Sequence, residues 1–392
     1  MKVVFFAQVM PDPCGAFFHD VGIAKELQRR GHTVTFVTTS RANKPIRDVY
    51  RGIPWVYFSN AENELRAAHV WSSPHFPFLN TVRRLNRSFQ KPLVITMHFG
   101  ENLETVRDNQ TKEWAEFLWI VSDHNSKSVR ERLTESGVPI LYKSVETIRP
   151  VMIENEVKFQ ERGTIPSGKY ITLINANVMK GLPLFIALAQ RFPNRRFLGV
   201  RPYYNRINVP ENFSNIKWIN IQDDVRDILK DTRILLVPSL YESWGRVAFE
   251  AMYNGIPVIH TTPMSPTDPG NTRASGSTEG MCEWIDGTQF MLEFAKFDDW
   301  VAAIESLDDA DTYAEYSAKA YEQTYNMNIF SDILSVEERF VDYGMRFSPK
   351  PMASNKGGVQ TPTVPPALRT MRMPAPGGGG MPLRGGRFSL KK

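Results

Sequence analysis

The sequence predicts an α/β protein with two domains, each built on a parallel sheet. Three observations lead to this fold class. Short apolar runs alternate with helical patterns, a polar segment interrupts the alternation at residues 161–168, and 392 residues with 42% hydrophobic content can fill two cores. We expect a first domain over residues 1–160 and a second over residues 161–328, with residues 161–168 as the interdomain linker.

The first half begins with an apolar strand and continues with strands and helices in turn. A strand is expected at residues 3–7, followed by a helix at 17–30 whose apolar residues recur at helical spacing and which ends at Gly31. Further strands are expected at the following ranges: 33–38, 68–71, 93–96 and 118–121. A helix at 126–136 follows the last of them, and strands separated by helices pair in parallel.

The second half repeats the alternation without repeating the sequence. Strands are expected at 170–174, 196–200, 234–237 and from 258 onward. Helices are expected at 182–191, 223–229, 299–307, 310–325 and 331–343. Asp309 precedes one of these helices, and we interpret Asp309 and Asp311 as helix-capping chemistry and not as a metal motif.

Composition sets limits on location and partners. Two cysteines, Cys14 and Cys282, make a disulfide framework improbable and favour the reducing cytoplasm. The sequence contains no apolar run near the ~18 residues of a membrane helix. Residues 346–392 hold nine of the 47 basic residues and no acid, which leaves 38 basic and 42 acidic residues in the rest of the chain. This Gly- and Pro-rich tail is predicted to be disordered, and it gives the protein a possible polyanion or membrane-surface contact.

The most informative segment joins two buried strands in the second half. The strand at 234–237 leads into a loop from Glu242 to Gly245, and a helix carrying Glu250 follows. Ligands of open α/β sheets bind at the carboxyl ends of strands, where helix amides without intrahelical partners can hold a phosphate. Gly245 has no side chain to obstruct that approach. The segment therefore predicts a phosphate-binding site flanked by two carboxylates.

The whole segment resembles a known family. Pro238-Ser239 precedes Glu242, Gly245 follows three residues later, and residues 250–252 and 254–258 read Glu-Ala-Met and Asn-Gly-Ile-Pro-Val. This pattern resembles the nucleotide-sugar loop of retaining glycosyltransferases with the GT-B architecture, most of all family four (glycosyl transferases group 1). The resemblance implies two Rossmann-like domains facing across a cleft. It also implies a C-terminal helix, here residues 329–345, that packs back toward the first domain.

The resemblance also implies roles for the residues of this loop. The backbone amides of Gly245, Arg246 and Val247 would hold the donor phosphates, Glu250 would bind the ribose hydroxyls, and Glu242 would lie near the transferred sugar. A carboxylate suits either role because it accepts two hydrogen bonds from a diol. Such enzymes stabilise the leaving diphosphate with helix dipoles, amides and basic side chains, so no metal site is expected.

Three further positions match the family in part. Lys180 of a Lys-Gly pair would reach the diphosphate, but Asn175 stands where an Arg is common, so Arg201 or Arg246 would have to replace that cation. Gly15 matches a Gly-Gly loop whose second position is Ala16 here. His98 follows a first-domain strand and resembles the His that contacts the donor hexose. His19 and Asp20, at the start of the helix that follows Gly15, either face the acceptor or lie on the surface.

These observations predict a glycosyltransferase whose candidate catalytic residues are Glu242, His98 and Lys180. The donor would be a nucleoside-diphosphate sugar linked to UDP or GDP, and no cofactor is expected. The acceptor stays open between a glycan, a lipid, a protein and a modified nucleic acid. Two alternatives remain: a sugar phosphorylase or epimerase on the same fold, and a non-catalytic polyanion-binding protein with a glycosyltransferase-like body.

Overall fold

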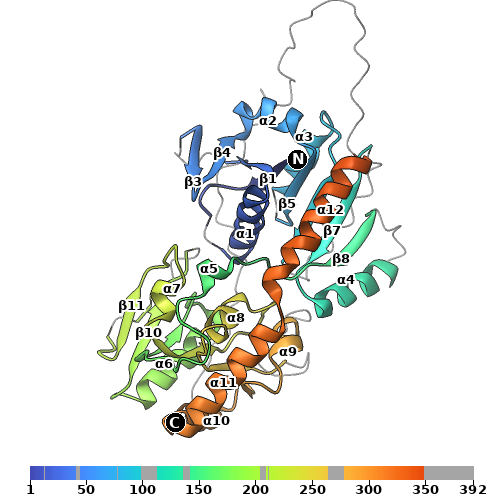
Figure 1. Cartoon of the computed structure of the whole chain (residues 1–392). Helices are drawn as coiled ribbons and strands as arrows, with labels where there is room; N and C mark the ends of the chain where they lie inside the picture. Colours follow the sequence, from blue (N-terminus) through green and yellow to red (C-terminus); the bar gives the residue numbers. More distant parts are fainter. Residues whose placement is uncertain are drawn as a thin grey trace, which may run out of the picture.

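Two α/β domains make up the structure (Figure 1), a computed structural model that describes residues 1–12, 14–40, 45–76, 78–98, 113–135, 142–203, 209–210, 212–263 and 278–347. Each domain is built on one sheet, and the sheets have eight and six strands. The α/β class predicted from the sequence is confirmed. The predicted tail lies outside the described residues from position 348 onward.

The first-domain sheet is parallel except for one edge strand. Its strands, in sheet order, are β3 (Arg47–Tyr50), β4 (Ile53–Tyr57), β2 (Thr33–Thr38), β1 (Lys2–Ala7), β5 (Val70–Pro74), β6 (Leu93–Met97), β7 (Glu116–Ile120) and β8 (Ser144–Thr147). Only the pairing of β3 with β4 is antiparallel among the described strands. Its helices are α1 (Gly15–Arg29), α2 (Glu62–Ala67), α3 (Leu79–Asn86) and α4 (Asp123–Glu135).

Both faces of this sheet are buried, which explains the uninterrupted apolar run of β1. Val3 and Phe5 point into the core shared with α1, whereas Val4 and Phe6 point into the core shared with α2, α3 and α4. Alternate residues of a strand face opposite sides, so a strand covered by helices on both sides must be apolar throughout.

The second-domain sheet is parallel in every described pairing. Its strands, in sheet order, are β11 (Ile216–Ile219), β10 (Arg196–Val200), β9 (Tyr170–Leu173), β12 (Thr232–Val237), β13 (Val258–Thr261) and β14 (Phe290–Leu292). Its helices are α6 (Leu182–Arg191), α7 (Arg226–Leu229), α8 (Arg246–Met252), α9 (Glu279–Ile285), α10 (Phe297–Ser306) and α11 (Ala310–Asn326). In β12, Ile234 and Leu236 pack with α6 and α10, and Leu235 and Val237 pack with α8 and α9.

One predicted helix is much shorter in the structure. The pattern indicated a helix at 223–229, but α7 begins at Arg226. Val225 is the N-cap residue of α7, and just before it the Asp224 carboxylate accepts a hydrogen bond from the Arg226 amide at 2.9 Å. Such a local side-chain-to-backbone hydrogen bond competes with the helical pattern. Residues 223–225 therefore form a loop that remains free to border the space between the domains. Asp309, in contrast, caps α11 as predicted, because its side chain accepts from the Thr312 amide.

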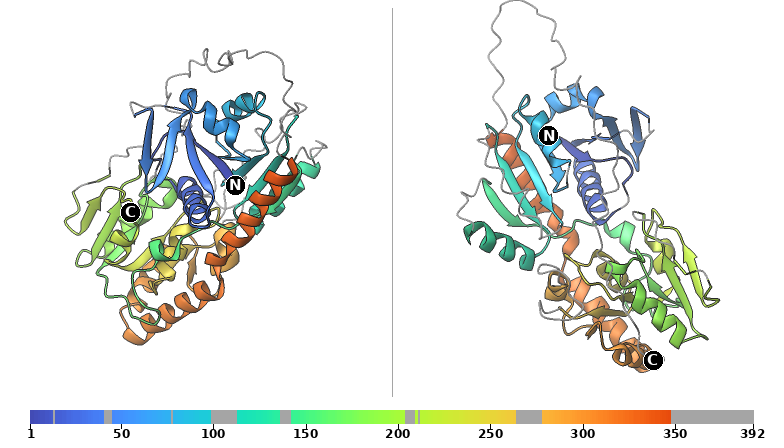
Figure 2. Two further views of the ribbon diagram at one scale, coloured as in Figure 1. Left: turned by 45° about the horizontal axis from the view of Figure 1, so that its top comes forward. Right: turned by 180° about the vertical axis from the view of Figure 1, so that it is seen from behind.

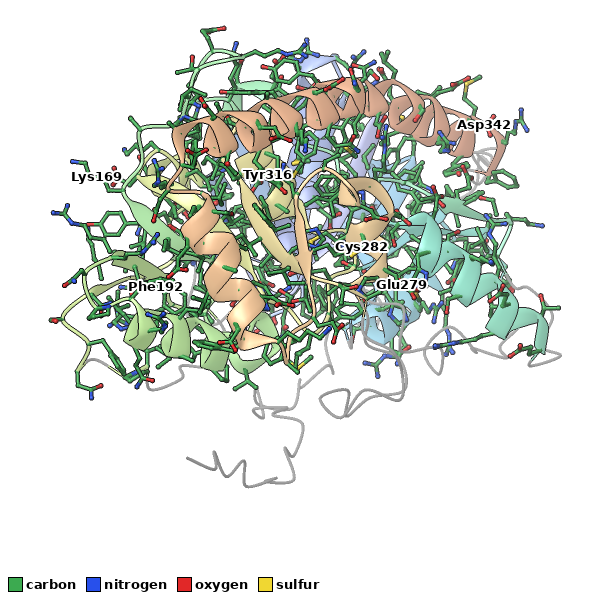
Figure 3. The ribbon with its side chains drawn as sticks, turned by 90° about the horizontal axis from the view of Figure 1, so that it is seen from below. Lys169, Phe192, Glu279, Cys282, Tyr316 and Asp342 are labelled. Atoms are coloured by element: carbon green, nitrogen blue, oxygen red, sulfur yellow. The ribbon has the colours of Figure 1, made fainter. Side chains whose placement is uncertain are left out.

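The final helix, α12 (Asp332–Phe347), crosses from the second domain to the first (Figure 2). Its apolar side packs on the first-domain sheet: the Tyr343 ring stacks on Phe117 at 3.6 Å between centroids, and Phe340 meets Trp119 at 5.1 Å. At its start, Asp332 accepts two hydrogen bonds from Arg149, at 2.7 and 2.8 Å. Figure 3 shows this helix from below, with Asp342 toward its end and Tyr316 on the neighbouring α11. The helix thus ties the two domains together.

Both cysteines are free thiols. Cys14 precedes α1, and Cys282 lies buried in α9. Figure 3 labels Cys282 and also Glu279, the first residue of the same helix. Burial and the Asp12 carboxylate raise the pKa of the Cys14 thiol to about 12, so that this thiol stays protonated near neutral pH. Among the helices of the described chain, none has the length and apolar character needed to span a bilayer.

Candidate active site

A cavity of about 1010 Å³ lies between the domains. Residues of the β1–α1 segment and His98, which follows β6, line it from the first domain. Residues that follow β9 and β12 line it from the second. The carboxyl ends of parallel strands are the usual ligand sites of open α/β sheets. The volume lies at the upper end of the range of small-molecule pockets, ~300–1,000 Å³.

The loop before α8 is shaped by Gly245. This residue adopts a φ of +76°, and an added Cβ would lie 2.5 Å from Met281. The fold itself therefore requires glycine here, apart from any need to admit a phosphate. Gly245, Arg246 and Val247 all line the cavity, as does Glu250 one turn later.

Arg246 and Glu250 form an ion pair along α8. The Arg246 Nε donates to the Glu250 carboxylate at 2.7 Å, and the Glu250 side chain is only 8% exposed. One terminal nitrogen of Arg246, Nη1, is buried and lacks a hydrogen-bond partner among the described residues. A buried guanidinium nitrogen without a partner is costly, so this cation is suited to receive an anionic ligand.

Lys180 and Glu242, which the sequence analysis placed in separate segments, meet in the cavity. The Lys180 ammonium donates to the Glu242 carboxylate at 2.5 Å, and the Ser239 hydroxyl donates to the same carboxylate at 2.7 Å. Lys180 ends the short 3-10 helix η3 (Val178–Lys180), where its amide donates to the Asn177 side chain. Gly181 follows with a φ of +80°, and an added Cβ would meet the Pro238 carbonyl at 2.2 Å. The Lys-Gly pair is therefore held firmly beside the loop that carries Glu242.

Asn175 has a structural reason to replace the arginine common in the family. It adopts a φ of +62°, a left-handed conformation that asparagine tolerates better than most residues. Its side-chain oxygen accepts from Asn177 at 3.1 Å. Of the two cations considered as substitutes, Arg246 is the one that lines the cavity together with Asn175.

The start of α1 leaves open space in the first-domain wall. An added Cβ on Gly15 would meet nothing within 4 Å in the described part of the chain. Protein packing therefore does not explain a glycine here, whereas a ligand approaching the backbone would. Ala16 lies in the first turn of α1 and so has an ordinary helical φ, which is the condition that its methyl group requires.

His98 belongs to the same first-domain wall, and His19 lies beside it. Their ring centroids are 5.2 Å apart in an edge-to-face arrangement, and both residues are buried and line the cavity. Burial and the Arg246 charge lower the pKa of His98 from 6.5 to about 3. The pKa of His19 lies well below its ordinary value, because of burial and then the neighbouring His98 and Arg246. Both imidazoles are therefore neutral, which suits hydrogen bonding better than acid catalysis.

The described residues bring together one group of three potential metal ligands: His19, Asp20 and His98. Their ligand atoms all lie within 4.8 Å of one another, and all three residues are buried. Burial raises the pKa of Asp20 well above its ordinary value. The sequence analysis found no metal cluster, because His98 lies far from the other two residues in the chain.

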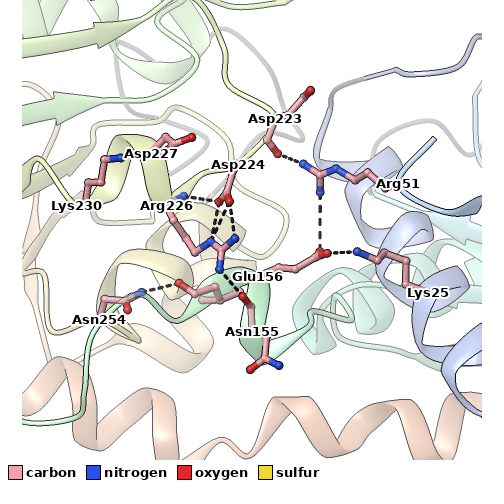
Figure 4. A network of polar contacts seen from close by, with 11 residues as sticks. Lys25, Arg51, Asn155, Glu156, Asp223, Asp224, Arg226, Asp227, Lys230 and Asn254 are labelled. Atoms are coloured by element: carbon pink, nitrogen blue, oxygen red, sulfur yellow. Dashed lines mark hydrogen bonds and ion pairs between the residues drawn. The ribbon is translucent and has the colours of Figure 1, made fainter.

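An ionic network joins the domains beside the cavity (Figure 4). It centres on Glu156 of α5 (Glu154–Val157), whose carboxylate pairs with Lys25 of α1 and with Arg51 of the β3–β4 turn. Arg51 also donates to the backbone carbonyl of Asp223 in the second domain. All four residues line the cavity. The network therefore connects the two walls at the edge of the site.

Sequence reasoning did not single out several of these cavity residues. Asp12, Arg51, Glu156 and Asp223 carry no local motif, and His19 was left between the acceptor site and the surface. The structure places His19 in the buried wall. The available signal was its spacing: His19 lies four residues after Gly15 and therefore on the same face of the helix.

Comparison with known proteins defines the class. Residues 205–269 match the model of the family described as glycosyl transferases group 1, and this stretch includes Glu242 and Glu250. No curated protein sequence matches the chain. Among solved structures, sucrose-phosphate synthase from Thermosynechococcus elongatus is similar with a TM-score of 0.63 and 13% identity, over 87% of this chain and 99% of that one.

Two further structures are similar along nearly their whole length. HepE from Anabaena in complex with UDP and glucose has a TM-score of 0.62 and 17% identity, over 86% of this chain and 99% of that one. The catalytic domain of starch synthase IV from Arabidopsis thaliana, bound to ADP and acarbose, has a TM-score of 0.54 and 12% identity, over 88% of this chain and 99% of that one. The fold and the family match confirm the class predicted from the sequence, a glycosyltransferase with the GT-B architecture.

Proposed function

We propose that the protein transfers a sugar from a nucleoside-diphosphate sugar to a hydroxyl acceptor, with the donor bound in the interdomain cavity. One observation carries the proposal: Lys180, Glu242, Arg246, Glu250 and His98, assigned separately by resemblance, line a single cavity. These five polar side chains come from three separate segments and from both domains, so their convergence on one cavity favours a shared role. A cavity of about 1010 Å³ also has room for a nucleotide, a diphosphate and a hexose.

The donor would lie mainly against the second domain. Glu250 would bind the ribose hydroxyls, and the amides of Gly245 to Val247 would hold the diphosphate with Arg246 and Lys180. Each of these two cations is paired with a carboxylate in the structure: Lys180 with Glu242 and Arg246 with Glu250. A bound diphosphate would share Lys180 with Glu242. It would also give the buried Nη1 of Arg246 the acceptor that this nitrogen lacks within the described structure.

The reaction would proceed with retention at the anomeric carbon. The bond from that carbon to the β-phosphate oxygen breaks, and a bond to the acceptor oxygen forms on the same face. The acceptor proton passes to the leaving diphosphate. Lys180 and Arg246 would stabilise the charge that grows on the diphosphate, which is how preorganised cations lower a barrier. With these two side chains and the α8 amides in that role, we propose that transfer needs no metal ion.

The first-domain wall would receive the hexose and the acceptor. His98 is neutral and can exchange hydrogen bonds with sugar hydroxyls. Gly15 leaves open space beside it for an acceptor to approach the reacting carbon. A glycan, lipid, protein or modified nucleic acid each offers a suitable hydroxyl, and the cavity residues do not select among them.

Release of the nucleoside diphosphate from UDP- and GDP-glucose tests the proposal. UDP is the first candidate because the structurally similar HepE was solved with UDP and glucose. The wild-type protein should hydrolyse one of these donors slowly, and Lys180→Ala should lower the rate of release by about 10²- to 10³-fold. Binding without any release in the presence of candidate acceptors would favour a non-catalytic protein. Release that requires inorganic phosphate and yields a sugar 1-phosphate would favour a phosphorylase, and conversion to an isomeric sugar nucleotide would favour an epimerase.

The basic tail suggests a second binding function. Nine cations without an acid in residues 346–392 can neutralise phosphates of a polyanion. We place the protein in the cytoplasm, consistent with two free thiols, with this tail as a contact to an anionic acceptor, scaffold or membrane surface. Deleting residues 349–392 should remove salt-sensitive binding to RNA, DNA or anionic vesicles and leave donor hydrolysis intact. Equal binding by the full and truncated chains would contradict this function.

A further inference from the structure

We propose that His19 determines sugar specificity: its Nε2–H donates a hydrogen bond to a hydroxyl oxygen of the transferred sugar, beside His98. The inference rests on the proposed function and extends it to a residue for which the family resemblance supplied no role. It makes His19 a substrate-binding residue of the first-domain wall.

The helix α1 places His19 at the cavity. Gly15 begins α1, and His19 follows four residues later, so that both residues share one face of the helix. Gly15, Ala16 and His19 all line the cavity. The first two residues carry little or no side chain, so a ligand can reach past them to the imidazole one turn below.

A backbone hydrogen bond fixes the tautomer of His19. The amide of Val151 donates to the His19 Nδ1 at 3.1 Å, so this nitrogen must carry a lone pair and no hydrogen. A neutral imidazole holds its single hydrogen on the other nitrogen, Nε2. The ring is neutral because burial, His98 and Arg246 lower its pKa. His19 therefore presents a hydrogen-bond donor whose hydrogen cannot move to the other nitrogen.

That donor lacks a partner in the described part of the chain. The His19 Nε2 is fully buried without a hydrogen bond, and the same holds for the His98 Nε2 and for one oxygen of Asp20. Buried polar groups are nearly always paired in folded proteins, and an unpaired one costs ~1–3 kcal/mol. Two of these residues, His19 and His98, line the cavity, and Asp20 follows His19 directly in α1. Two unpaired nitrogens in one wall of the cavity indicate that a ligand supplies the missing partners.

The tautomer favours a hydroxyl group over a metal ion as that partner. A metal would need a lone pair on the His19 Nε2, but the Val151 amide occupies the other nitrogen and leaves the hydrogen on Nε2. A hydroxyl oxygen can accept from Nε2–H and still donate its own hydrogen to a neighbour such as His98. Two nitrogens that each hydrogen-bond to one oxygen at about 2.8 Å lie within ~5.6 Å of each other. One ring nitrogen of His19 and one of His98 lie within 4.8 Å of each other, which is inside this limit.

The proposal predicts strong selection against sugars that lack this hydroxyl. A site built to donate to a hydroxyl leaves a buried N–H unpaired when the substrate lacks the oxygen. Loss of one hydroxyl should therefore weaken donor binding much more than the lost contact area would. Free nucleoside diphosphate has no sugar to transfer, so its affinity should not depend on His19.

Calorimetric titration of substituted proteins tests the assignment. The probes are the tightest binder among UDP-, GDP-, ADP- and dTDP-glucose, its four monodeoxy derivatives, and the matching free diphosphate. The variants are His19→Phe, which removes both ring nitrogens at similar volume, and His19→Gln, which keeps an N–H near the Nε2 position. His260→Phe is the matched control, because His260 is a buried histidine of the second-domain sheet that is absent from the described cavity lining.

The expected result has three parts. His19→Phe should bind the sugar nucleotide at least about tenfold more weakly and the free diphosphate unchanged, whereas His19→Gln should lose less than about threefold. The wild type should reject one monodeoxy derivative by at least about tenfold, and His19→Phe should not distinguish it from the parent. His260→Phe should bind every probe like the wild type. If His19→Phe fails to fold, titrations of the wild type and of His19→Gln with the four monodeoxy derivatives still test whether His19 binds a sugar hydroxyl.

Three results would overturn the assignment while the proposed function stands. In the first, His19→Phe weakens binding of the sugar nucleotide and of the free diphosphate equally. In the second, the wild type binds all four monodeoxy derivatives with the same affinity. In the third, the wild type binds Zn²⁺ with a stoichiometry of one and His19→Phe does not. If the wild type binds none of the sugar nucleotides, the proposed function itself fails, and the role of His19 falls with it.

Discussion

Replacing Glu250 with alanine removes the group proposed to bind the donor ribose. Its side chain is only 8% exposed and accepts from Arg246 at 2.7 Å, so the carboxylate is already oriented at the cavity wall. Losing a hydrogen bond to a charged group costs about 1–3 kcal/mol. Because 1.4 kcal/mol corresponds to a tenfold change, the donor dissociation constant should rise about 5- to 150-fold.

The same substitution leaves Arg246 without its carboxylate partner. Removing one member of a fully buried ion pair costs about 3–5 kcal/mol. The Arg246 side chain is 23% exposed, so water should reduce that cost and the variant should remain folded. Calorimetric titration with the free nucleoside diphosphate measures the binding loss, and thermal unfolding verifies the fold. Glu305→Ala serves as the control, since Glu305 is a half-exposed helix residue that pairs with Arg191 in the second domain.

Glu250→Gln refines the assignment. It keeps one acceptor oxygen and loses the charge, so its dissociation constant should lie between those of the wild type and Glu250→Ala. A folded Glu250→Ala protein that binds the diphosphate within twofold of the wild type would refute the ribose assignment.

Four further outcomes are expected. Lys180→Ala should lower kcat by about 10²- to 10³-fold and change the donor KM less, because charge grows on the diphosphate in the transition state. Steady-state kinetics measure both constants. A raised KM with an unchanged kcat would limit Lys180 to ground-state binding. Activity should survive EDTA, and complete loss restored by Mg²⁺ or Mn²⁺ would contradict the proposed metal independence. Glu116→Ala should lower the free energy of unfolding by about 3–5 kcal/mol in urea titrations. The reason is that the buried Arg83 guanidinium loses the carboxylate that Arg83 now contacts at 2.8 Å. A loss of less than about 1 kcal/mol would show that water reaches the site. The pKa of His98 falls from 6.5 to about 3 on folding, so the unfolded chain binds more protons between these values and stability should decrease as the pH falls below 6.5. For His98→Asn the decrease between pH 6.5 and 5.0 should be smaller than in the wild type by about 1.5 kcal/mol, and an unchanged pH dependence would show that His98 does not stay neutral in the folded chain.

Most of the fold could be predicted because buried faces of strands and helices require apolar residues at a characteristic spacing in the sequence. Strands buried on both faces are apolar throughout, as in β1 and β12, and helices with one buried face show helical spacing, as in α1 and α6. The β3–β4 hairpin was missed for a local reason. Its two-residue turn has positive φ at both positions, 49° at Arg51 and 81° at Gly52, and arginine is an unusual residue for such a turn.

The second-domain part of the site could be predicted because its residues are close in the sequence. Glu242, Gly245 and Glu250 belong to one strand–loop–helix unit, so one continuous pattern identifies them. The ion pair of Lys180 with Glu242 joins segments 62 residues apart, and the contact of His19 with His98 depends on how two strands and a helix pack. The ionic network around Glu156 requires knowledge of how the domains meet, which local spacing does not contain.

Calorimetric titration of the wild-type protein with UDP-, GDP-, ADP- and dTDP-glucose tests the central claim most directly. The claim is that the interdomain cavity binds a nucleoside-diphosphate sugar through Lys180, Arg246 and Glu250. One of the four should bind with a stoichiometry of one, and the matching free diphosphate should compete with it. A cavity that binds none of them at millimolar concentration, in a protein that is folded by thermal unfolding, would contradict the account.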